Sequence, residues 1–289
     1  MTVSFRRIGK FAAFVALAAG VLTGAARVGV GRYLSSARGK ALVADRLGTA
    51  LGMPVEVSDV DVGDDTSSFR FRVMDPADPK AEVLAVRSAS ADVSAADFMT
   101  GRVAPSALNL SGAALTLRVG PDGQVLTPLP ALPGSGGMVP TVAIADGRIC
   151  IRQEGRPDFA VSGVNLKLEP AGHVVALSGT VNDPKWGAWT VRGELRRDTR
   201  TGWVELASKD APLDPELLAT IPFVSANLFD EVRSADRAAV TVRVEVGPDR
   251  DVQPTVEIRQ TRRIFGIPAE ATVRLVPGSP GVQTPDYSR

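Results

Sequence analysis

Residues 189–196 read WTVRGELR, and the order of these residues decides the fold class. Odd-numbered positions hold apolar or small residues, while even-numbered positions hold threonine, arginine or glutamate. Because successive side chains of a β-strand point to opposite faces of a sheet, this pattern is typical of a strand with one apolar face and one polar face.

The same alternation continues on both sides of this segment. It returns at 69–73 (FRFRV), 164–169 (VNLKLE) and 240–246 (VTVRVEV), among about a dozen segments of this kind. Most are joined by turns too short to hold a helix, which argues against a βαβ fold. The pattern predicts a mainly β chain built on an elongated, curved, groove-like antiparallel sheet with few short helices.

Residues 127–140 (TPLPALPGSGGMVP) break the alternation with four prolines and three glycines. This composition predicts an exposed loop between two β-rich modules. The first module, with its leading helix, covers 33–126, and the second covers 141–276. The polar, Pro- and Gly-rich tail at 277–289 is predicted to be disordered.

Local signals predict smaller features. The alternation slips by one residue at Ser58–Asp59, which indicates a β-bulge, and Asp146–Gly147 indicates a tight hairpin turn. We expect a short helical turn at Ala95–Gly101 and broken helical pieces at 214–233. The two tryptophans of 183–189 (DPKWGAW) are interpreted as turn packing, with a membrane-interface or partner contact as the alternative.

A helix is predicted over residues 33–51. Its apolar stripe repeats at spacings of three and four, Gly52 stands where a left-handed C-terminal glycine belongs, and Pro54 prevents continuation. Two interpretations stay open: an amphipathic helix leading from a membrane to the sheet, or an ordinary core helix. The stripe comprises Tyr33, Ala37, Ala41, Ala44, Leu47 and Leu51.

The first forty residues carry seven basic side chains and no acidic one, and Phe11–Ala26 is uncharged. Extended to residues 8–30, this run is long enough to span a membrane, because the flanking basic side chains can reach the headgroups. The alternative is a signal peptide cleaved near Thr23–Ala26. Residues 1–32 are therefore predicted to be an anchor or a signal, and both send the rest of the chain across the membrane.

Composition excludes several function classes. The formal net charge is +1, and removing the seven basic residues of 1–40 leaves 1 − 7, or −6, so nucleic acid is not an expected partner. One cysteine and one histidine exclude an internal disulfide and a Cys/His metal framework. With no Ser/His/Asp set, phosphate loop or metal-ligand spacing in the sequence, we predict neither an enzyme nor a cofactor.

The apolar sides of the predicted strands need a cover, and helices are scarce. A dozen strands present a face on the order of 1,000 Å², more than monomers usually expose. Either the sheet closes as a sandwich or an apolar ligand lies on it, and a membrane tether favours lipid acyl chains. The candidate groove residues are Val57, Phe69, Phe71, Leu115, Leu117, Ile149, Ile151, Leu166, Leu168, Leu177, Val191, Leu195, Val242, Val244, Val256 and Ile258.

Several stretches are similar, in order, to AsmA-like proteins, the bacterial relatives of the repeating β-groove lipid-transfer proteins. The helix runs into LGTALGMPVEVSDVDV (47–62), and FRFRVMDP (69–76) follows. LNLSGAALTL (108–117) matches the family pattern L-x-L-x-G-x-x-L-x-L, and VAIADGRICIR (142–152) resembles its recurring I-x-d-G-x-I-x-I strand pair. The resemblance covers residues 8–195 and concerns the amino-terminal module of the family.

The resemblance implies a single-pass inner-membrane protein whose bulk lies in the periplasm. It would bind or transfer phospholipid acyl chains in an apolar β-groove and support envelope lipid homeostasis, without catalytic residues. Family members are usually longer, and a dozen strands span only about 60 Å, so other envelope proteins are expected as partners. The alternative is an anchored structural or assembly factor with a closed sandwich that binds another envelope protein. Cleavage of the N-terminal segment would leave it periplasmic or secreted.

Overall fold

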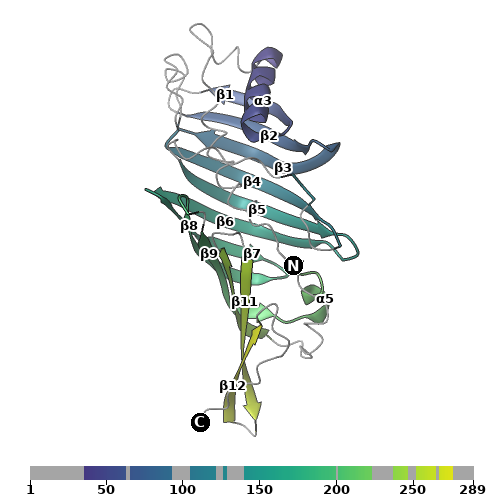
Figure 1. The fold of residues 1–289 in the computed structure, drawn as a ribbon, viewed down its shortest axis with the longest axis vertical. Coiled ribbons are helices and arrows are strands. Elements are labelled where there is room, and N and C mark those ends of the chain that lie inside the picture. Colours follow the sequence, from purple (N-terminus) through teal and green to yellow (C-terminus); the bar gives the residue numbers. More distant parts are fainter. Residues whose placement is uncertain are drawn as a thin grey trace.

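The computed structural model describes residues 36–62, 66–92, 105–121, 126–128, 140–199, 201–222, 237–246, 252–264 and 267–275. These residues form one twelve-stranded sheet whose strands lie in sequence order from β1 to β12 (Figure 1). The strands are β1 (Val55–Val62), β2 (Ser67–Asp75), β3 (Asp78–Ala91), β4 (Ala107–Val119), β5 (Thr141–Gln153), β6 (Phe159–Ala171), β7 (Val174–Asp183), β8 (Gly187–Arg196), β9 (Gly202–Pro212), β10 (Arg237–Val246), β11 (Val252–Ile264) and β12 (Ile267–Leu275); the helices are α3 (Ala37–Leu51) and α5 (Pro215–Leu218).

The prediction of a mainly β chain with one long sheet and few helices is confirmed. The sheet is open, since its strand order runs from β1 at one edge to β12 at the other. Figure 1 shows that β1–β5 run across the long axis of the molecule, whereas β11 and β12 run nearly along it. The right-handed twist between neighbouring strands, added up over the sheet, produces this rotation.

The prediction of a wholly antiparallel sheet is wrong at one place. Strands β4 and β5 are parallel, with a register that runs from Ala107 opposite Thr141 to Val119 opposite Gln153. A parallel neighbour requires the chain to return along the whole strand, about 43 Å for β4. Residues 120–140 can span about 70 Å when extended, so the Pro/Gly-rich segment 127–140 belongs to a connection that is long enough for this return.

Helix α3 confirms the predicted helix and, at Leu47 and Leu51, part of its predicted buried stripe. Ser36 caps the N-terminus by accepting a hydrogen bond from the Gly39 N–H, and Gly52 ends the helix in the left-handed conformation at φ 63°. The buried face comprises Val43, Leu47 and Leu51, whereas Ala37 and Ala41 of the predicted stripe are exposed. The larger side chains decide the orientation, because they remove more apolar area from water.

Two local predictions have different outcomes. The bulge at Ser58–Asp59 is confirmed by the shift in register between β1 and β2. The hairpin turn at Asp146–Gly147 is wrong, because both residues lie inside β5, where the register with β6 shifts and Asp146 has φ 53°. An Asp-Gly pair tolerates a positive φ in a bulge as well as in a turn. Strand β5 pairs with β4 on both sides of this bulge, so the strand continues instead of reversing direction.

Some predicted segments lie outside the described residues. These are the anchor or signal at 1–32, the helical turn at Ala95–Gly101, the tail at 277–289 and most of 214–233, from which only α5 and its flanks are described. Most of the loop predicted to be exposed at 127–140 also lies outside them, and its described Thr127 is buried. No helix among the described residues has the length and apolarity to cross a membrane.

Candidate functional site

The strand registers align apolar residues into rows that cross the sheet. One row runs through Phe69, Ala89, Leu110, Ile144, Leu166, Gly179, Val191, Leu206 and Val242 on strands β2–β10. The neighbouring positions along the strands belong to the other side of the sheet, where Arg72, Lys167 and Arg192 are exposed. We call the side that carries this row the apolar face and the opposite side the polar face.

The register puts the predicted groove residues on the apolar face. Val256 pairs with Val242 in the ladder, although its side chain lies outside the described residues. The buried members are Phe69, Phe71, Leu117, Leu168, Val191 and Ile258. The half-buried members are Val57, Leu115, Ile149, Ile151, Leu166, Leu177, Leu195, Val242 and Val244.

Helix α3 covers the apolar face at the β1 end of the sheet. Leu47 and Leu51 of the helix are each 1% exposed and belong to the same packed cluster as Phe71, Val73 and strands β3 and β4. Figure 1 shows α3 beside β1 and β2 at this end. Phe69 and Phe71, predicted to line a groove, therefore serve as protein core.

Farther along the sheet, the apolar face mixes buried residues such as Ile144, Leu168 and Val191 with half-buried ones. Ile149, Ile151, Leu166, Leu177 and Leu206 are half-buried aliphatic residues on β5, β6, β7 and β9. The part of the chain that the structure describes forms a single sheet, so it supplies no second sheet to face them. This stretch is the candidate binding surface.

Glycines mark a bend toward the apolar face in β7, β8 and β9. Gly179, Gly193 and Gly202 lie on successive strands, each one row farther along the register. A Cβ atom at Gly193 would lie 2.7 Å from the Trp203 carbonyl oxygen, and the carbonyls of neighbouring strands are closer still at the other two glycines. No side chain fits at such distances, so glycine at these three positions lets the neighbouring strands crowd together on the apolar face. Such crowding on one side is expected where a sheet curls toward that side.

The comparisons with known proteins add no relative. No protein-family model, curated protein or solved structure matches the chain. The similarity to AsmA-like proteins rests on the quoted motifs and stays a prediction.

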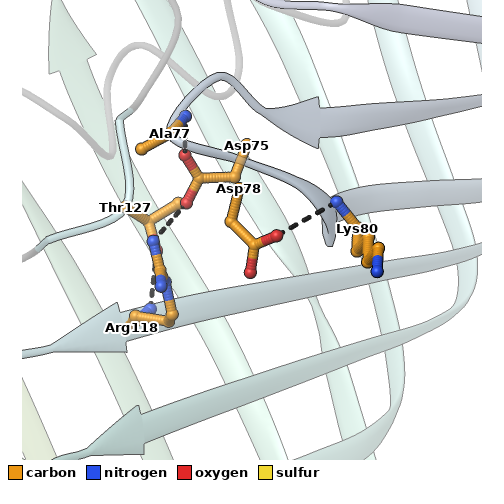
Figure 2. Close-up of polar contacts among 6 residues, drawn as sticks. All are labelled: Asp75, Ala77, Asp78, Lys80, Arg118 and Thr127. Atoms are coloured by element: carbon orange, nitrogen blue, oxygen red, sulfur yellow. Dashed lines mark hydrogen bonds and ion pairs between the residues drawn. The ribbon is translucent and has the colours of Figure 1, made fainter.

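A buried carboxylate ties strand ends beside this face (Figure 2). Asp75, at the end of β2, is 1% exposed and forms an ion pair with Arg118 of β4. Its other oxygen accepts a hydrogen bond from the Ala77 N–H at 2.8 Å. Thr127, also 1% exposed, accepts from the Arg118 N–H at 2.6 Å and donates its own N–H to the Arg118 carbonyl at 3.3 Å. The contacts fix the start of the β4–β5 connection.

A second polar corner lies at the β7–β8 turn. Asp183 accepts hydrogen bonds from the Ser162 N–H and hydroxyl at 2.8 and 2.7 Å, and from the N–H groups of Lys185 and Trp186. Burial acts to raise the pKa of Asp183, but the Ser162 hydroxyl and these N–H groups outweigh it and hold the pKa below its ordinary value. The corner is a structural anchor.

The two tryptophans near this corner confirm the turn-packing interpretation. Trp186 is buried, donates its indole N–H to the Ala160 carbonyl at 3.2 Å and packs against Phe159 with ring centroids 5.2 Å apart. Trp189 donates to the Trp186 carbonyl at 2.7 Å. Sequence reasoning missed Asp75 and Asp183 as anchors, because a buried acid is recognised only by partners distant in the chain.

Proposed function

We propose that the protein binds phospholipid acyl chains on the concave part of its apolar face. It would do so as a membrane-attached periplasmic protein of the AsmA-like kind, without catalysis, in support of envelope lipid homeostasis. The observation that carries the proposal is the continuous apolar row across β2–β10. Leu166, Leu206 and Val242 of this row are half-buried, beside buried Ile144 and Val191, and no second sheet within the described ranges faces them.

The chemistry of the surface favours an acyl chain over an extended peptide. Ile149, Leu166, Leu177 and Leu206 have no hydrogen-bonding atoms in their side chains. An extended peptide on them would leave backbone N–H and C=O groups unpaired, which costs free energy. An acyl chain has no such groups, and its burial contributes about 0.8 kcal/mol per methylene whatever the headgroup.

Matched substitutions on the two faces test the proposal. We expect the full chain, purified without added lipid, to carry phospholipid that is identified by mass spectrometry of an organic extract. Leu177→Glu places a charge on the apolar face and should lower lipid recovery about tenfold or more. Ser178→Glu, one residue away on the polar face, should leave recovery unchanged. Equal recovery from both variants, each folded by circular dichroism, would refute the proposal.

The tryptophans provide an independent readout. Trp189 contributes to the packed clusters of the apolar face, whereas Trp203 lies on the polar face with Arg243 4.5 Å from its ring centroid. In variants that retain one of these tryptophans, phospholipid brominated in its acyl chains should quench the fluorescence of Trp189 and spare Trp203. Quenching of Trp203 alone would place the lipid on the wrong face.

A further inference from the structure

We infer that a line of β-bulges across β1–β6 forms one crease in the sheet, and that the ion pair between Arg87 and Asp146 is the clasp that fixes the bend at this crease. This device is separate from the proposed lipid-binding surface and does not require lipid. It lies where neighbouring strands lose their regular register at adjacent positions. The crease comprises Ser58, Arg87–Ser88, Gly112, Asp146–Gly147 and Gly163.

The sequence changes phase at the crease. In β4, the apolar positions are even-numbered up to Leu110 and odd-numbered from Ala113, and in β5 they are even-numbered up to Ile144 and odd-numbered from Ile149. Strands β1, β3 and β6 also change phase. In a regular strand, this change would move half of the apolar residues to the polar face. One extra residue at the change of phase keeps them all on the apolar face, so the bulges follow from the sequence.

The irregular positions are neighbours across the sheet. The β1–β2 register shifts at Ser58, and the β2–β3 register shifts opposite Arg70. The registers on either side align Gly112 of β4 with Arg87 of β3 and with Asp146 of β5, and the β5–β6 register shifts beside Asp146. Aligned bulges bend each strand at the same place, so the sheet bends along one line. Three residues of the crease have a left-handed backbone: Gly112 and Gly163 at φ 61° and Asp146 at φ 53°.

On the α3 side of the crease, side chains bind carbonyl groups of neighbouring strands. The Ser58 carbonyl accepts a hydrogen bond from Lys40 Nζ of α3 at 2.7 Å, and the Ser58 hydroxyl donates to the Arg70 carbonyl at 3.4 Å. Arg70 Nε donates to the Arg87 carbonyl at 3.0 Å. Because a bulge disrupts the backbone ladder, these contacts connect α3, β1, β2 and β3 across the disruption.

On the other side of the crease, one asparagine connects β5 to β6. The Asn165 side chain accepts a hydrogen bond from the Asp146 N–H at 3.1 Å and donates to the Gly163 carbonyl at 3.1 Å. Aspartate tolerates a positive φ better than most residues do, and the bond to Asn165 holds the Asp146 backbone in place. Asp146 is therefore positioned to pair with a side chain from β3.

The clasp joins these two groups of contacts across β4. Arg87 Nη1 lies 3.6 Å from Asp146 Oδ2, where the pairs of the β4–β5 ladder stop at Ser111 and resume at Ala114. Arg87 passes close to Gly112, because a Cβ atom on this glycine would lie 2.8 Å from Arg87 Cζ. Glycine thus leaves the space that the arginine needs, and the clasp spans the interrupted part of the parallel junction.

The clasp controls the bend of the sheet more than its stability. Its side chains are 69% and 68% exposed, and an exposed ion pair contributes little to the free energy of unfolding. At the crease, however, it acts where backbone pairs are interrupted, so it can narrow the range of bend angles. Loss of the clasp should therefore broaden this range without unfolding the sheet.

Distances between two spin labels measure the bend. In the full chain carrying Cys150→Ser, Lys80→Cys on β3 and Asn109→Cys on β4 place labels on opposite sides of the crease, about 33 Å apart along the strands. Double electron–electron resonance should give one narrow distance distribution. Arg87→Gln should make it about twofold broader, and Asp146→Asn should do the same, because asparagine tolerates the left-handed backbone but lacks the charge.

Arg72→Gln is the matched control. Arg72 forms an exposed ion pair with Glu82 at 3.0 Å between β2 and β3, away from the crease, so its loss should leave the distribution unchanged. Salt at about 1 M should broaden the distribution of the chain with the clasp and not that of Arg87→Gln, since screening weakens the same interaction. With each variant shown to be folded by circular dichroism, a broad distribution before substitution, an unchanged width in Arg87→Gln, or equal broadening by Arg72→Gln would overturn the inference.

Discussion

Asp75 shows how a single buried side chain supports a long open sheet. It joins the end of β2 to Arg118 on β4, two strands away, and Arg118 in turn holds Thr127 (Figure 2). A buried carboxylate is costly unless its oxygens are paired, and here both oxygens have partners. These contacts lie at the end of β4, where the chain begins the long connection to its parallel neighbour β5.

We therefore expect Asp75→Ala to lower the free energy of unfolding by about 2 kcal/mol, because Arg118 and the Ala77 N–H lose their partner. Urea unfolding monitored by circular dichroism measures the change. The control is Asp78→Ala, which removes an exposed acid whose contact is the Lys80 N–H at 3.1 Å and should cost clearly less. An equal effect of the two substitutions would contradict the role assigned to Asp75.

Asp183 gives the protein a sensitivity to acid. Because its pKa is lower in the folded state than the ordinary value of 3.8, the stability it contributes is complete above that value and is lost as the pH falls through the folded pKa. We expect the free energy of unfolding to decrease from pH 5 to pH 3, and less steeply in Asp183→Asn. Urea titrations across this range test it, and parallel curves for the two proteins would argue against it.

At the scale of elements, the bend in β7–β9 depends on residues without side chains. Gly179 pairs with Leu166 on β6 and Val191 on β8, and a Cβ there would overlap the Asn165 carbonyl oxygen. Backbone cannot yield as a flexible side chain can. The concavity of the apolar face and the glycine positions are therefore linked.

We predict that Gly179→Ala destabilises the protein by about 2 kcal/mol, within the range for overpacking of a close contact. It should also weaken lipid binding, because relief of the overlap flattens the sheet. Ser178→Ala, on the opposite face, is the control and should change neither property. Thermal unfolding and lipid recovery provide the two readouts, and a gain in stability for Gly179→Ala would show that the bend is not constrained there.

The limits of prediction are clearest for elements whose partners lie far away. The end of α3 at Gly52 and the bulge at Ser58–Asp59 followed from local sequence, since a left-handed glycine and a slip in alternation are local properties. The buried side of α3 followed only in part: Leu47 and Leu51 were predicted, but Val43 was missed, although it lies four residues before Leu47. Alanines placed at helical spacing masked that signal.

At the scale of the whole molecule, stability is distributed unevenly along the sheet. The largest packed cluster joins α3 to β1–β5 and reaches β7, whereas smaller clusters occupy the later strands. Because each strand pairs only with its neighbours in sequence, the sheet resembles a linear array. Local opening is easiest where few buried contacts must break.

Hydrogen exchange should follow this distribution. We expect the amides of β2, β3 and β4 to exchange slowest and those of β11 and β12 to exchange fastest, as measured by mass spectrometry of peptic fragments. Addition of phospholipid should slow exchange most in β5–β10 if the proposed surface is occupied. Uniform protection over all twelve strands would mean that the sheet unfolds as one cooperative unit.

The sequence alone determined that this chain is a mainly β protein with one continuous apolar face, because alternation is a property of neighbouring residues. It also placed the candidate residues of the site on that face. Only the tertiary structure decided that β4 and β5 are parallel, that α3 seals Phe69 and Phe71, and that glycines bend the later strands. Each of these depends on contacts between residues distant in the chain, which strand periodicity does not record.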